Sequence, residues 1–190
     1  MIVYLHGFNS SPASHKARLL HQYLAERGLA GHYACPALPT WPEQAIAAAE
    51  SAMGAGAPGK ACLVGSSLGG FYATHLAEKH GARAVLINPA IEPHVGLRAF
   101  LGPQVNLHTG EPYELTETHL RQLQRLVVPR VTPEQYLLIV ETGDEVLDYR
   151  RAVARYAGAA QVVVEGGDHS LASFPRHLPR ILEFAGLTKS

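Results

Sequence analysis

The segment Ala61-Cys62-Leu63-Val64-Gly65-Ser66-Ser67-Leu68-Gly69-Gly70 joins four apolar residues to a serine flanked by glycines. The apolar run predicts a buried strand, and the residues from Leu68 onward predict a helix. Between them lies the pattern G-x-S-x-G, in which a sharp strand-to-helix turn holds the central serine in strained backbone geometry with its hydroxyl exposed above a sheet. Glycines are needed on both sides because a side chain there would collide with the neighbouring strand or helix. Ser67 is therefore a candidate nucleophile; the alternative is a simple serine N-cap of a glycine-rich helix.

Strands and helices are predicted to alternate along the chain, as they do around this segment. We expect strands at Ile2–His6, His32–Cys35, Ala61–Gly65, Ala84–Asn88, Tyr136–Glu141 and Gln161–Glu165. We expect helices at Ser14–Arg27, Pro42–Met53, Leu68–His80, Thr116–Leu126, Asp148–Tyr156 and Pro175–Phe184. Thr116 suits a helix start, although His119 stands where a capping box has Glu or Gln. Leu137–Val140 is wholly apolar, as strands buried on both faces are. The pattern predicts an α/β fold, a compact three-layer sandwich of about six mainly parallel strands with helices on both faces.

The composition indicates one domain, residues 1–190, without an excess of charge. Hydrophobic residues make up 47% of the chain, and 16 Lys and Arg balance 16 Asp and Glu. This balance argues against a nucleic-acid-binding protein or a polybasic membrane-surface protein, because both need positive charge to hold phosphates. The apolar stretches are far shorter than the roughly 20 residues of a membrane span, and the first residues resemble a strand more than an export signal. Cys35 and Cys62 are interpreted as buried thiols of a reducing compartment, so we expect a cytoplasmic protein.

One long excursion interrupts the alternation. About forty residues, Pro89–Arg130, separate two predicted strands, and the part from Ile91 to Tyr113 has little clear period. We interpret residues 91–130 as a small cap-like excursion over the carboxyl edge of the sheet, where long insertions are often functional. Together with Phe8, Trp41 and Phe71, it is expected to form the walls of a substrate pocket. These three aromatic residues suit an ordinary core or rim equally well, because the sequence does not fix which way they face.

A serine hydroxyl needs a base within hydrogen-bonding reach, and the base needs a carboxylate to orient it. Among eleven histidines, His169 follows the last predicted strand and so leaves the sheet at the same edge as Ser67. A solvent-facing surface histidine is the alternative. Asp144 directly follows the strand Tyr136–Glu141 and is the preferred carboxylate. Asp148 is the reserve, since it also suits a helix N-cap, and Asp168 is expected to point away from its neighbour His169.

The negative charge that forms when a carbonyl is attacked needs fixed N–H donors. The backbone amide of Leu68, at the start of a helix, is one expected donor. The second is the amide of Phe8, in the turn His6-Gly7-Phe8 after the first strand, where Gly7 allows close backbone approach. A plain strand-ending turn is the alternative reading of this segment. We find no HExxH spacing and no Cys/His cluster that would indicate a metal site.

Six segments taken together support a family resemblance. They are His6-Gly7-Phe8-Asn9-Ser10-Ser11, Gly65-Ser66-Ser67-Leu68-Gly69-Gly70, Ile87-Asn88-Pro89-Ala90, Thr109-Gly110-Glu111, Thr142-Gly143-Asp144-Glu145-Val146-Leu147-Asp148-Tyr149 and Gly167-Asp168-His169. In this order they resemble the small bacterial YqiA/YcfP-like esterases of the α/β-hydrolase superfamily, over essentially the whole chain. The resemblance implies a six-stranded parallel core and a Ser67-Asp144-His169 triad, with the amides of Phe8 and Leu68 as oxyanion donors.

The expected function is hydrolysis of acyl esters through an acyl-enzyme intermediate, and the resemblance leaves acyl-CoA thioesters open as a second substrate class. This chemistry needs no metal and no organic cofactor, and the expected partner is a small-molecule ester or thioester. Other acyl chemistry on the same residues, as in an amidase, an acyltransferase or a haloperoxidase-like enzyme, stays open. A non-catalytic binding protein that keeps the fold also stays open. The sequence does not disclose the physiological substrate, the acyl length or the oligomeric state.

Overall fold

A computed structural model describes residues 1–54 and 58–188, and its centre is a parallel sheet of six strands. Residues 55–57, in the predicted loop after the Pro42–Met53 helix, and residues 189–190, at the end of the predicted domain, lie outside the described part. The strands are β1 (Ile2–Leu5), β2 (Tyr33–Ala34), β3 (Cys62–Ser66), β4 (Arg83–Ile87), β7 (Tyr136–Glu141) and β8 (Ala160–Val164). Their order across the sheet is β2-β1-β3-β4-β7-β8, and all neighbouring pairs are parallel.

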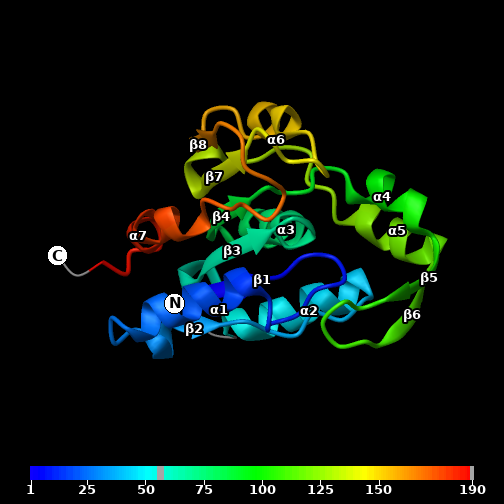
Figure 1. Cartoon of the computed structure of the whole chain (residues 1–190), viewed down its shortest axis with the longest axis horizontal. Helices are drawn as coiled ribbons and strands as arrows, with labels where there is room; N and C mark the ends of the chain where they lie inside the picture. The colour runs from blue at the N-terminus through cyan, green and yellow to red at the C-terminus, as the bar shows by residue number, and fades with distance from the viewer. Residues whose placement is uncertain (55–57, 189–190) are drawn as a thin grey trace.

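Helices cover both faces of the sheet, because the central strands are apolar on both sides. On one face, side chains such as Leu63, Leu86 and Leu138 pack against α2 (Pro42–Met53), α3 (Leu68–His80), α5 (Glu117–Arg125) and α6 (Tyr149–Arg155). On the other face, alternate side chains such as Val64, Val85 and Ile139 pack against α1 (His15–Ala25) and α7 (Phe174–Phe184). Figure 1 shows α7 and the C-terminus at the end of the molecule opposite β5 and β6. The predicted three-layer α/β fold is confirmed.

Most predicted elements are present with small shifts at their ends. The bounds of α2 and α3 agree with the prediction, because Pro42 suits the first turn of a helix and Gly81, with φ of 64°, ends α3. The strand predicted at His32–Cys35 is reduced to two residues, since Ala30–His32 forms a 3₁₀ turn, η1, directly before it. Two further 3₁₀ turns, η2 (Pro58–Lys60) and η4 (Pro133–Gln135), precede β3 and β7.

The excursion contains two strands that the sequence did not predict. After α4 (Pro93–Gly96) and the 3₁₀ turn η3 (Leu97–Phe100), β5 (Gly102–Val105) pairs with β6 (Pro112–Leu115) as an antiparallel hairpin. These two strands are difficult to predict from the sequence, because each contains a proline and neither alternates apolar and polar residues clearly. Figure 1 shows this hairpin beside α5, at one edge of the molecule.

Helix α5 begins with a capping box in which a histidine replaces the usual acid. The backbone N–H of Thr116 donates to His119 Nδ1 at 3.1 Å, which is the bond that Glu or Gln makes in the common form of the motif. The imidazole of His119 also stacks on Trp41, with ring centroids 3.7 Å apart. The predicted helix start is therefore confirmed, and His119 makes the capping-box bond for which the sequence has no Glu or Gln at this position.

The chain changes direction across the sheet at β1. From β1 it passes to β2 on one side and then returns to β3 on the other, so the loops after β1 and β3 diverge from a common point at the carboxyl edge. Ligands of open parallel sheets bind at such switch points. The loop Gly7–Ser10 and the turn at Ser67 both lie here. In the described residues, no helix is both long and apolar enough to cross a bilayer.

Candidate active site

Ser67 lies in the sharp turn between β3 and α3, and its backbone is strained. Its φ is 54° and its ψ is −119°, a conformation that costs a non-glycine residue about 1–3 kcal/mol. The turn is held by the N–H of Ser67, which donates to Ile87 O at 3.0 Å, and by its carbonyl, which accepts from Ala90 N at 3.0 Å. A Cβ at Gly69 would overlap the carbonyl oxygen of Leu5, and one at Gly65 would overlap that of Gly69. The two flanking glycines therefore allow the turn to form against β1 and α3.

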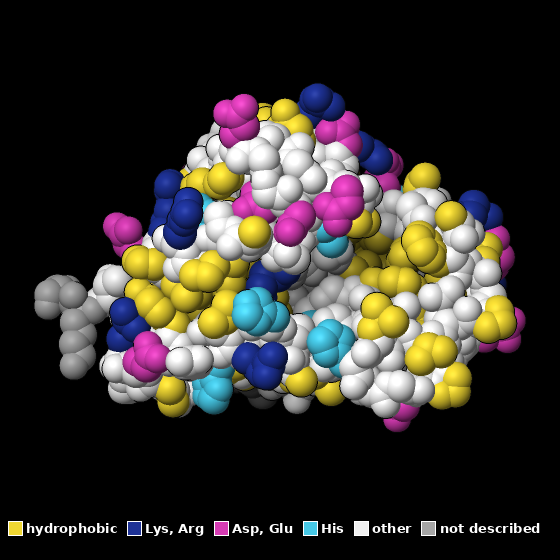
Figure 2. All heavy atoms as spheres, viewed as in Figure 1, with side chains coloured by type: hydrophobic (Ala, Val, Ile, Leu, Met, Phe, Trp, Pro, Cys, Tyr) yellow, Lys and Arg dark blue, Asp and Glu magenta, His cyan; other side chains and the backbone are white. Residues whose placement is uncertain are grey.

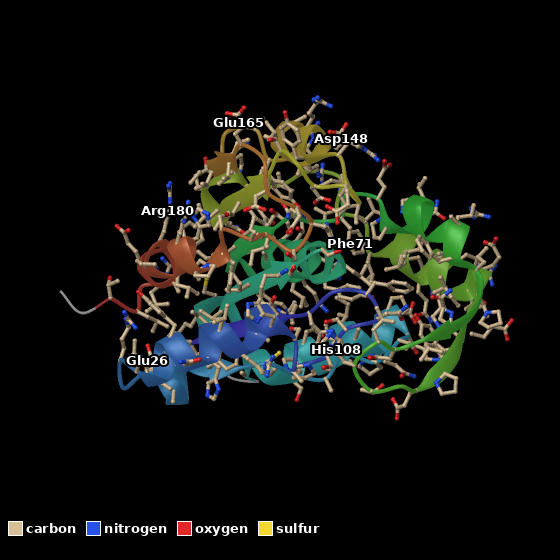
Figure 3. All side chains as sticks on the ribbon, in the orientation of Figure 1. Glu26, Phe71, His108, Asp148, Glu165 and Arg180 are labelled. Atoms are coloured by element: carbon tan, nitrogen blue, oxygen red, sulfur yellow. The ribbon has the colours of Figure 1, made fainter. Side chains whose placement is uncertain are left out.

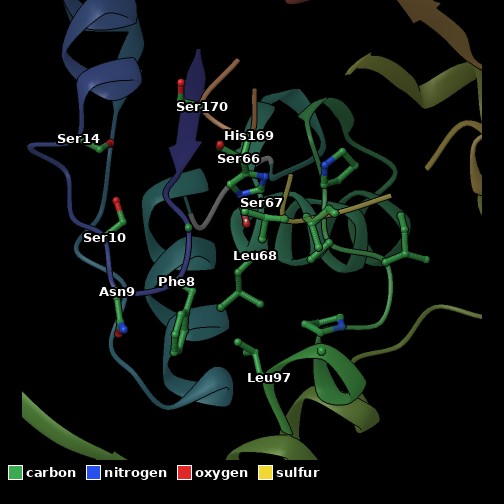
Figure 4. A pocket seen from close by; sticks show the side chains of 18 of the residues that line it. Phe8, Asn9, Ser10, Ser14, Ser66, Ser67, Leu68, Leu97, His169 and Ser170 are labelled. Carbon is green, nitrogen blue, oxygen red and sulfur yellow. Dashed lines mark hydrogen bonds between the residues drawn. The ribbon is translucent and has the colours of Figure 1, made fainter. Parts of the chain in front are cut away.

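Ser67, His169 and Asp144 form one hydrogen-bonded series, of which Figure 4 shows Ser67 and His169. Ser67 Oγ lies 3.1 Å from His169 Nε2. His169 Nδ1 lies 3.0 Å and 2.9 Å from the two carboxylate oxygens of Asp144. A carboxylate only accepts at neutral pH, so Nδ1 carries the imidazole proton and Nε2 is free to accept from the serine hydroxyl. Ser67 directly follows β3, and Asp144 and His169 lie in the loops that follow β7 and β8, at the sheet edge predicted from the sequence.

The loop after β7 fixes the carboxylate of Asp144. Its Oδ1 accepts hydrogen bonds from the backbone N–H of Val146 at 2.9 Å and of Leu147 at 2.8 Å. The Asp144 side chain is only 2% exposed, whereas that of Asp148 is 48% exposed. Asp148 instead caps α6 by accepting from Arg150 N at 3.0 Å. Asp144 is thus the carboxylate that contacts His169, and Asp148 has the capping role that was its alternative.

Phe8 and Leu68, whose amides are the predicted oxyanion donors, both line the cavity at Ser67. Neither amide donates to an acceptor within residues 1–54 and 58–188. Gly7 brings the two segments together, since a Cβ on it would lie 3.3 Å from that of Ser67. The turn therefore passes close to Ser67.

A cavity of about 740 Å³ opens above Ser67. One side is apolar and is formed by Phe8, Leu68, Ile91, Val95, Leu97 and Phe100, four of which belong to the excursion. The rings of Phe8 and Phe100 meet edge to face with centroids 6.1 Å apart. The other side carries Ser10, Ser14, His15, Lys16 and Ser170, and the charged residues Glu92, Glu145, Asp148 and Arg151 also line the cavity. In Figure 4, Phe8, Leu68 and Leu97 lie to one side of Ser67, apart from Ser10 and Ser14; Figure 2 shows hydrophobic side chains gathered beside the hollow.

Two of the three aromatic residues predicted to line the pocket do not do so. Phe8 lines the cavity, but Trp41 and Phe71 do not. Trp41 stacks on His119 instead, and Phe71, labelled in Figure 3, extends from α3 into the core, where it borders a separate cavity of about 260 Å³. Both have the ordinary packing role that was their alternative. The sequence could not decide whether Trp41 and Phe71 face the pocket. The direction of Phe71 depends on the rotation of α3 about its axis, and that of Trp41 on the path of the chain before α2.

Several polar groups that the sequence analysis did not assign hold the loop that carries His169. Glu141 and Asn88 are 1% and 2% exposed and contact its backbone from the ends of β7 and β4. Lys16 Nζ donates to Ser170 O at 2.8 Å. Burial lowers the pKa of Lys16, and the nearby carboxylates, that of Asp168 first, partly oppose this effect. One signal in the sequence could have indicated Glu141 and Asn88: each is a polar residue at the end of an apolar strand. A polar side chain that is buried there must find hydrogen-bond partners. Among the described residues, no cluster of three His, Cys, Asp or Glu side chains could hold a metal ion.

Comparison with solved structures defines the class of the fold. The mouse alpha/beta hydrolase domain-containing protein 10 superposes with a TM-score of 0.74 at 17% identity, over 97% of this chain and 89% of that chain. Est1E from Butyrivibrio proteoclasticus gives 0.64 at 15% identity, over 96% and 85%. The esterase domain of a Rhodothermus marinus protein gives 0.65 at 18% identity, over 97% and 84%. The chain therefore has the α/β-hydrolase fold.

The family follows from a match of the sequence itself. The model described as Uncharacterised protein family (UPF0227) matches residues 1–186, and the chain belongs to this family. The resemblance to the YqiA/YcfP-like group is confirmed by this match.

Proposed function

We propose that the protein is a serine hydrolase that cleaves acyl esters and acyl thioesters through an acyl-enzyme intermediate. One observation carries the proposal: Ser67 Oγ lies 3.1 Å from His169 Nε2, whose Nδ1 is bonded to the carboxylate of Asp144. A hydroxyl, an imidazole with its accepting nitrogen toward it, and a buried orienting carboxylate are the parts that nucleophilic catalysis by serine requires.

In the proposed reaction, His169 Nε2 takes the hydroxyl proton as Ser67 Oγ attacks the acyl carbonyl. The oxygen that becomes negative lies between the amides of Phe8 and Leu68, where each fixed donor lowers the barrier by about 3–4 kcal/mol. His169 then gives its proton to the leaving alcohol or thiol, and water cleaves the acyl-serine by the same steps. Asp144 keeps the imidazole in the tautomer that accepts at Nε2 and stabilises the imidazolium.

The two sides of the cavity suggest how a substrate lies in it. The leaving group takes its proton from His169, so it occupies the imidazole side, where Ser170 and Lys16 make the wall polar. The acyl chain then occupies the opposite, apolar side, against Phe8, Leu97 and Phe100. This arrangement favours an ester of an apolar acid with a polar alcohol or thiol.

The test is hydrolysis of p-nitrophenyl esters of increasing acyl length, followed by p-nitrophenol absorbance. We expect kcat/KM to rise as the chain fills the apolar side, and Ser67→Ala to abolish hydrolysis. Ser51→Ala, at an exposed position of α2, is the matched control and should behave like the wild-type protein. Hydrolysis that persists in Ser67→Ala would refute the mechanism.

A matched set of ester, thioester and amide substrates extends the same test to the leaving group. We expect turnover of the ester and the thioester. We expect slow or no turnover of the amide, because an amine is a poorer leaving group than an alcohol or a thiol. A fluorophosphonate probe should label the native protein but not Ser67→Ala. Absence of labelling in the native protein, together with no turnover, would favour the non-catalytic alternative.

A further inference from the structure

The backbone of residues 168–173, which carries His169, is held by a buried carboxylate. Glu141 is the last residue of β7 and lies on the same sheet face as Leu137 and Ile139, toward α7. Its Oε2 accepts from Asp168 N at 2.8 Å and from Ala172 N at 3.1 Å, and its Oε1 accepts from Ser173 N at 2.8 Å. Three N–H groups on the two sides of His169 thus converge on one side chain.

Asn88 holds the same loop through its carbonyl groups. Its Nδ2 donates to Asp168 O and to His169 O, each at 3.1 Å, and its Oδ1 accepts from Glu141 N at 3.0 Å. The two side chains are therefore linked to each other as well as to the loop. Glu141 binds N–H groups of the loop and Asn88 binds its carbonyl groups. These bonds restrict the position of the His169 imidazole.

A buried carboxylate is a costly way to fill this space. Glu141 is 1% exposed, and no Lys, Arg or His of the described residues forms an ion pair with it. Burial lowers the pKa of Lys16 and of His177, and the charge of Glu141 partly opposes this effect on both at longer range. Burying a charge without a contacting counter-ion is unfavourable unless hydrogen bonds satisfy it. The unusual density of N–H donors meets this requirement, and it does so only when the His169 loop has the conformation seen here.

We infer that Glu141 is a positioning residue for the reaction: with Asn88, it holds the His169 loop so that the imidazole bridges Ser67 and Asp144. The expected effect of Glu141 on turnover rests on the proposed function. Its expected effect on the hydrogen bond between His169 and Asp144 does not.

Two neighbouring glycines provide a matched pair of variants. Gly167 and Gly166 both have positive φ, 72° and 76°, so an alanine carries a similar backbone strain at either position. A Cβ at Gly167 would overlap the Glu141 carboxylate, whereas one at Gly166 would meet nothing within 4 Å. Gly167→Ala therefore displaces the carboxylate from its three donors without removing its charge, and Gly166→Ala controls for the strain.

We expect Gly167→Ala to lower kcat about 100-fold with KM changed less than about threefold, because a small misplacement of the base affects the chemical step more than binding. Gly166→Ala should keep kcat within about threefold of wild type, as a surface change leaves the base in place. Glu141→Gln keeps the size of the side chain and one acceptor oxygen, so its kcat should lie between those of the two glycine variants. This variant also provides the test if Gly167→Ala does not fold. Glu78→Gln removes a carboxylate bonded to Thr132 and Tyr136 elsewhere in the fold, and should leave kcat unchanged.

The second readout is the downfield proton NMR signal of His169 Nδ1–H bonded to Asp144. We expect this signal in wild type, Gly166→Ala and Glu78→Gln, and its loss or broadening in Gly167→Ala and Glu141→Gln. Equal kcat and equal signals in the two glycine variants, or a fully active Glu141→Gln with an intact signal, would overturn the inference. If the wild-type protein turns over no ester, the proposed function fails, and the NMR comparison still decides the role of Glu141.

Discussion

At the scale of single residues, Ser67 and Glu141 each occupy a position that is unfavourable in isolation. The serine has a φ of 54°, and the glutamate carboxylate is buried without an ion pair among the described residues. Ser67 is stabilised by backbone hydrogen bonds to Ile87 and Ala90. The Glu141 carboxylate is stabilised by three backbone N–H groups of the loop that carries His169. Such costs are tolerated where a side chain must be held in one place, as in a site that positions a nucleophile and its base.

Glu141 should also make the stability of the protein depend on pH. Burial alone would raise its pKa, but hydrogen bonds from Ser173, Asp168 and Ala172 outweigh burial and hold the pKa below the ordinary value of 4.5. A group with a depressed folded-state pKa stabilises the fold above its unfolded pKa, and this contribution is lost as the pH falls through the folded value. The free energy of unfolding should therefore decline below about pH 4.5, and less steeply in Glu141→Gln.

Urea denaturation of both proteins at several pH values between about 3 and 6 measures this difference. Glu78→Gln serves as the control for the loss of a carboxylate from another part of the fold. Parallel stability curves for wild type and Glu141→Gln would contradict the assignment of a depressed pKa to Glu141.

Much of the site could be predicted because its residues follow strands. Ser67, Asp144 and His169 each come directly after a strand-like segment, and parallel strands bring such positions to one edge. Glu141 and Asn88 were predicted only as the last residues of strands, Asn88 also as part of a family motif. Their roles depend on which backbone groups lie opposite them, and that is decided by the packing of three separate loops. Trp41 and Phe71 were predicted to line the pocket and do not, because the sequence does not fix which way their side chains face.

At the scale of elements, the β5–β6 hairpin supports the loop that carries Phe8, whose amide is one of the two proposed oxyanion donors. Tyr113 OH donates to Asn9 Oδ1 at 2.6 Å, Asn106 Nδ2 donates to Ser10 O at 3.0 Å, and Leu107 N donates to Asn9 O at 3.1 Å. Asn9 has a φ of 51° and directly follows Phe8. The hairpin thus helps to fix the strained segment from which the Phe8 amide projects.

Removing the Tyr113 hydroxyl tests this support. Burial raises the pKa of Tyr113 to about 12, so the hydroxyl is a donor at neutral pH. We expect Tyr113→Phe to lower kcat by about fivefold, the equivalent of about 1 kcal/mol, because Asn9 loses one bond and the loop loosens. Ester hydrolysis measures the effect, with Tyr23→Phe in α1 as the control. Unchanged kcat in Tyr113→Phe would show that the hairpin does not affect the oxyanion loop.

The helices could be predicted more accurately than this hairpin. Residues 42–53 and 68–80 contain local signals at both ends, such as Pro42 and Gly81, that act through the backbone of the same element. The hairpin lacks such signals, since Gly102, Pro103 and Pro112 disfavour strands. Its two strands are stabilised by contacts with the Gly7–Ser10 loop, which lies about a hundred residues away in the sequence.

At the scale of the whole molecule, the sheet order brings the reacting groups together. The loops after β1 and β3 diverge at the switch point, and the loops after β7 and β8 reach the same carboxyl edge from the other side. The sequence predicted parallel strands and their number, but the order β2-β1-β3-β4-β7-β8 is a property of packing that strand patterns do not encode. The excursion covers the apolar side of the cavity with Ile91, Leu97 and Phe100.

The most direct test is to trap the acyl group on the protein. A p-nitrophenyl ester reaction quenched in acid within the first turnovers, followed by peptide mass spectrometry, reports where the acyl group is bound. We predict one acyl adduct per chain, on the peptide that contains Ser67, and none in Ser67→Ala. Hydrolysis at the wild-type rate with no adduct on that peptide, or with the adduct on another residue, would contradict the account.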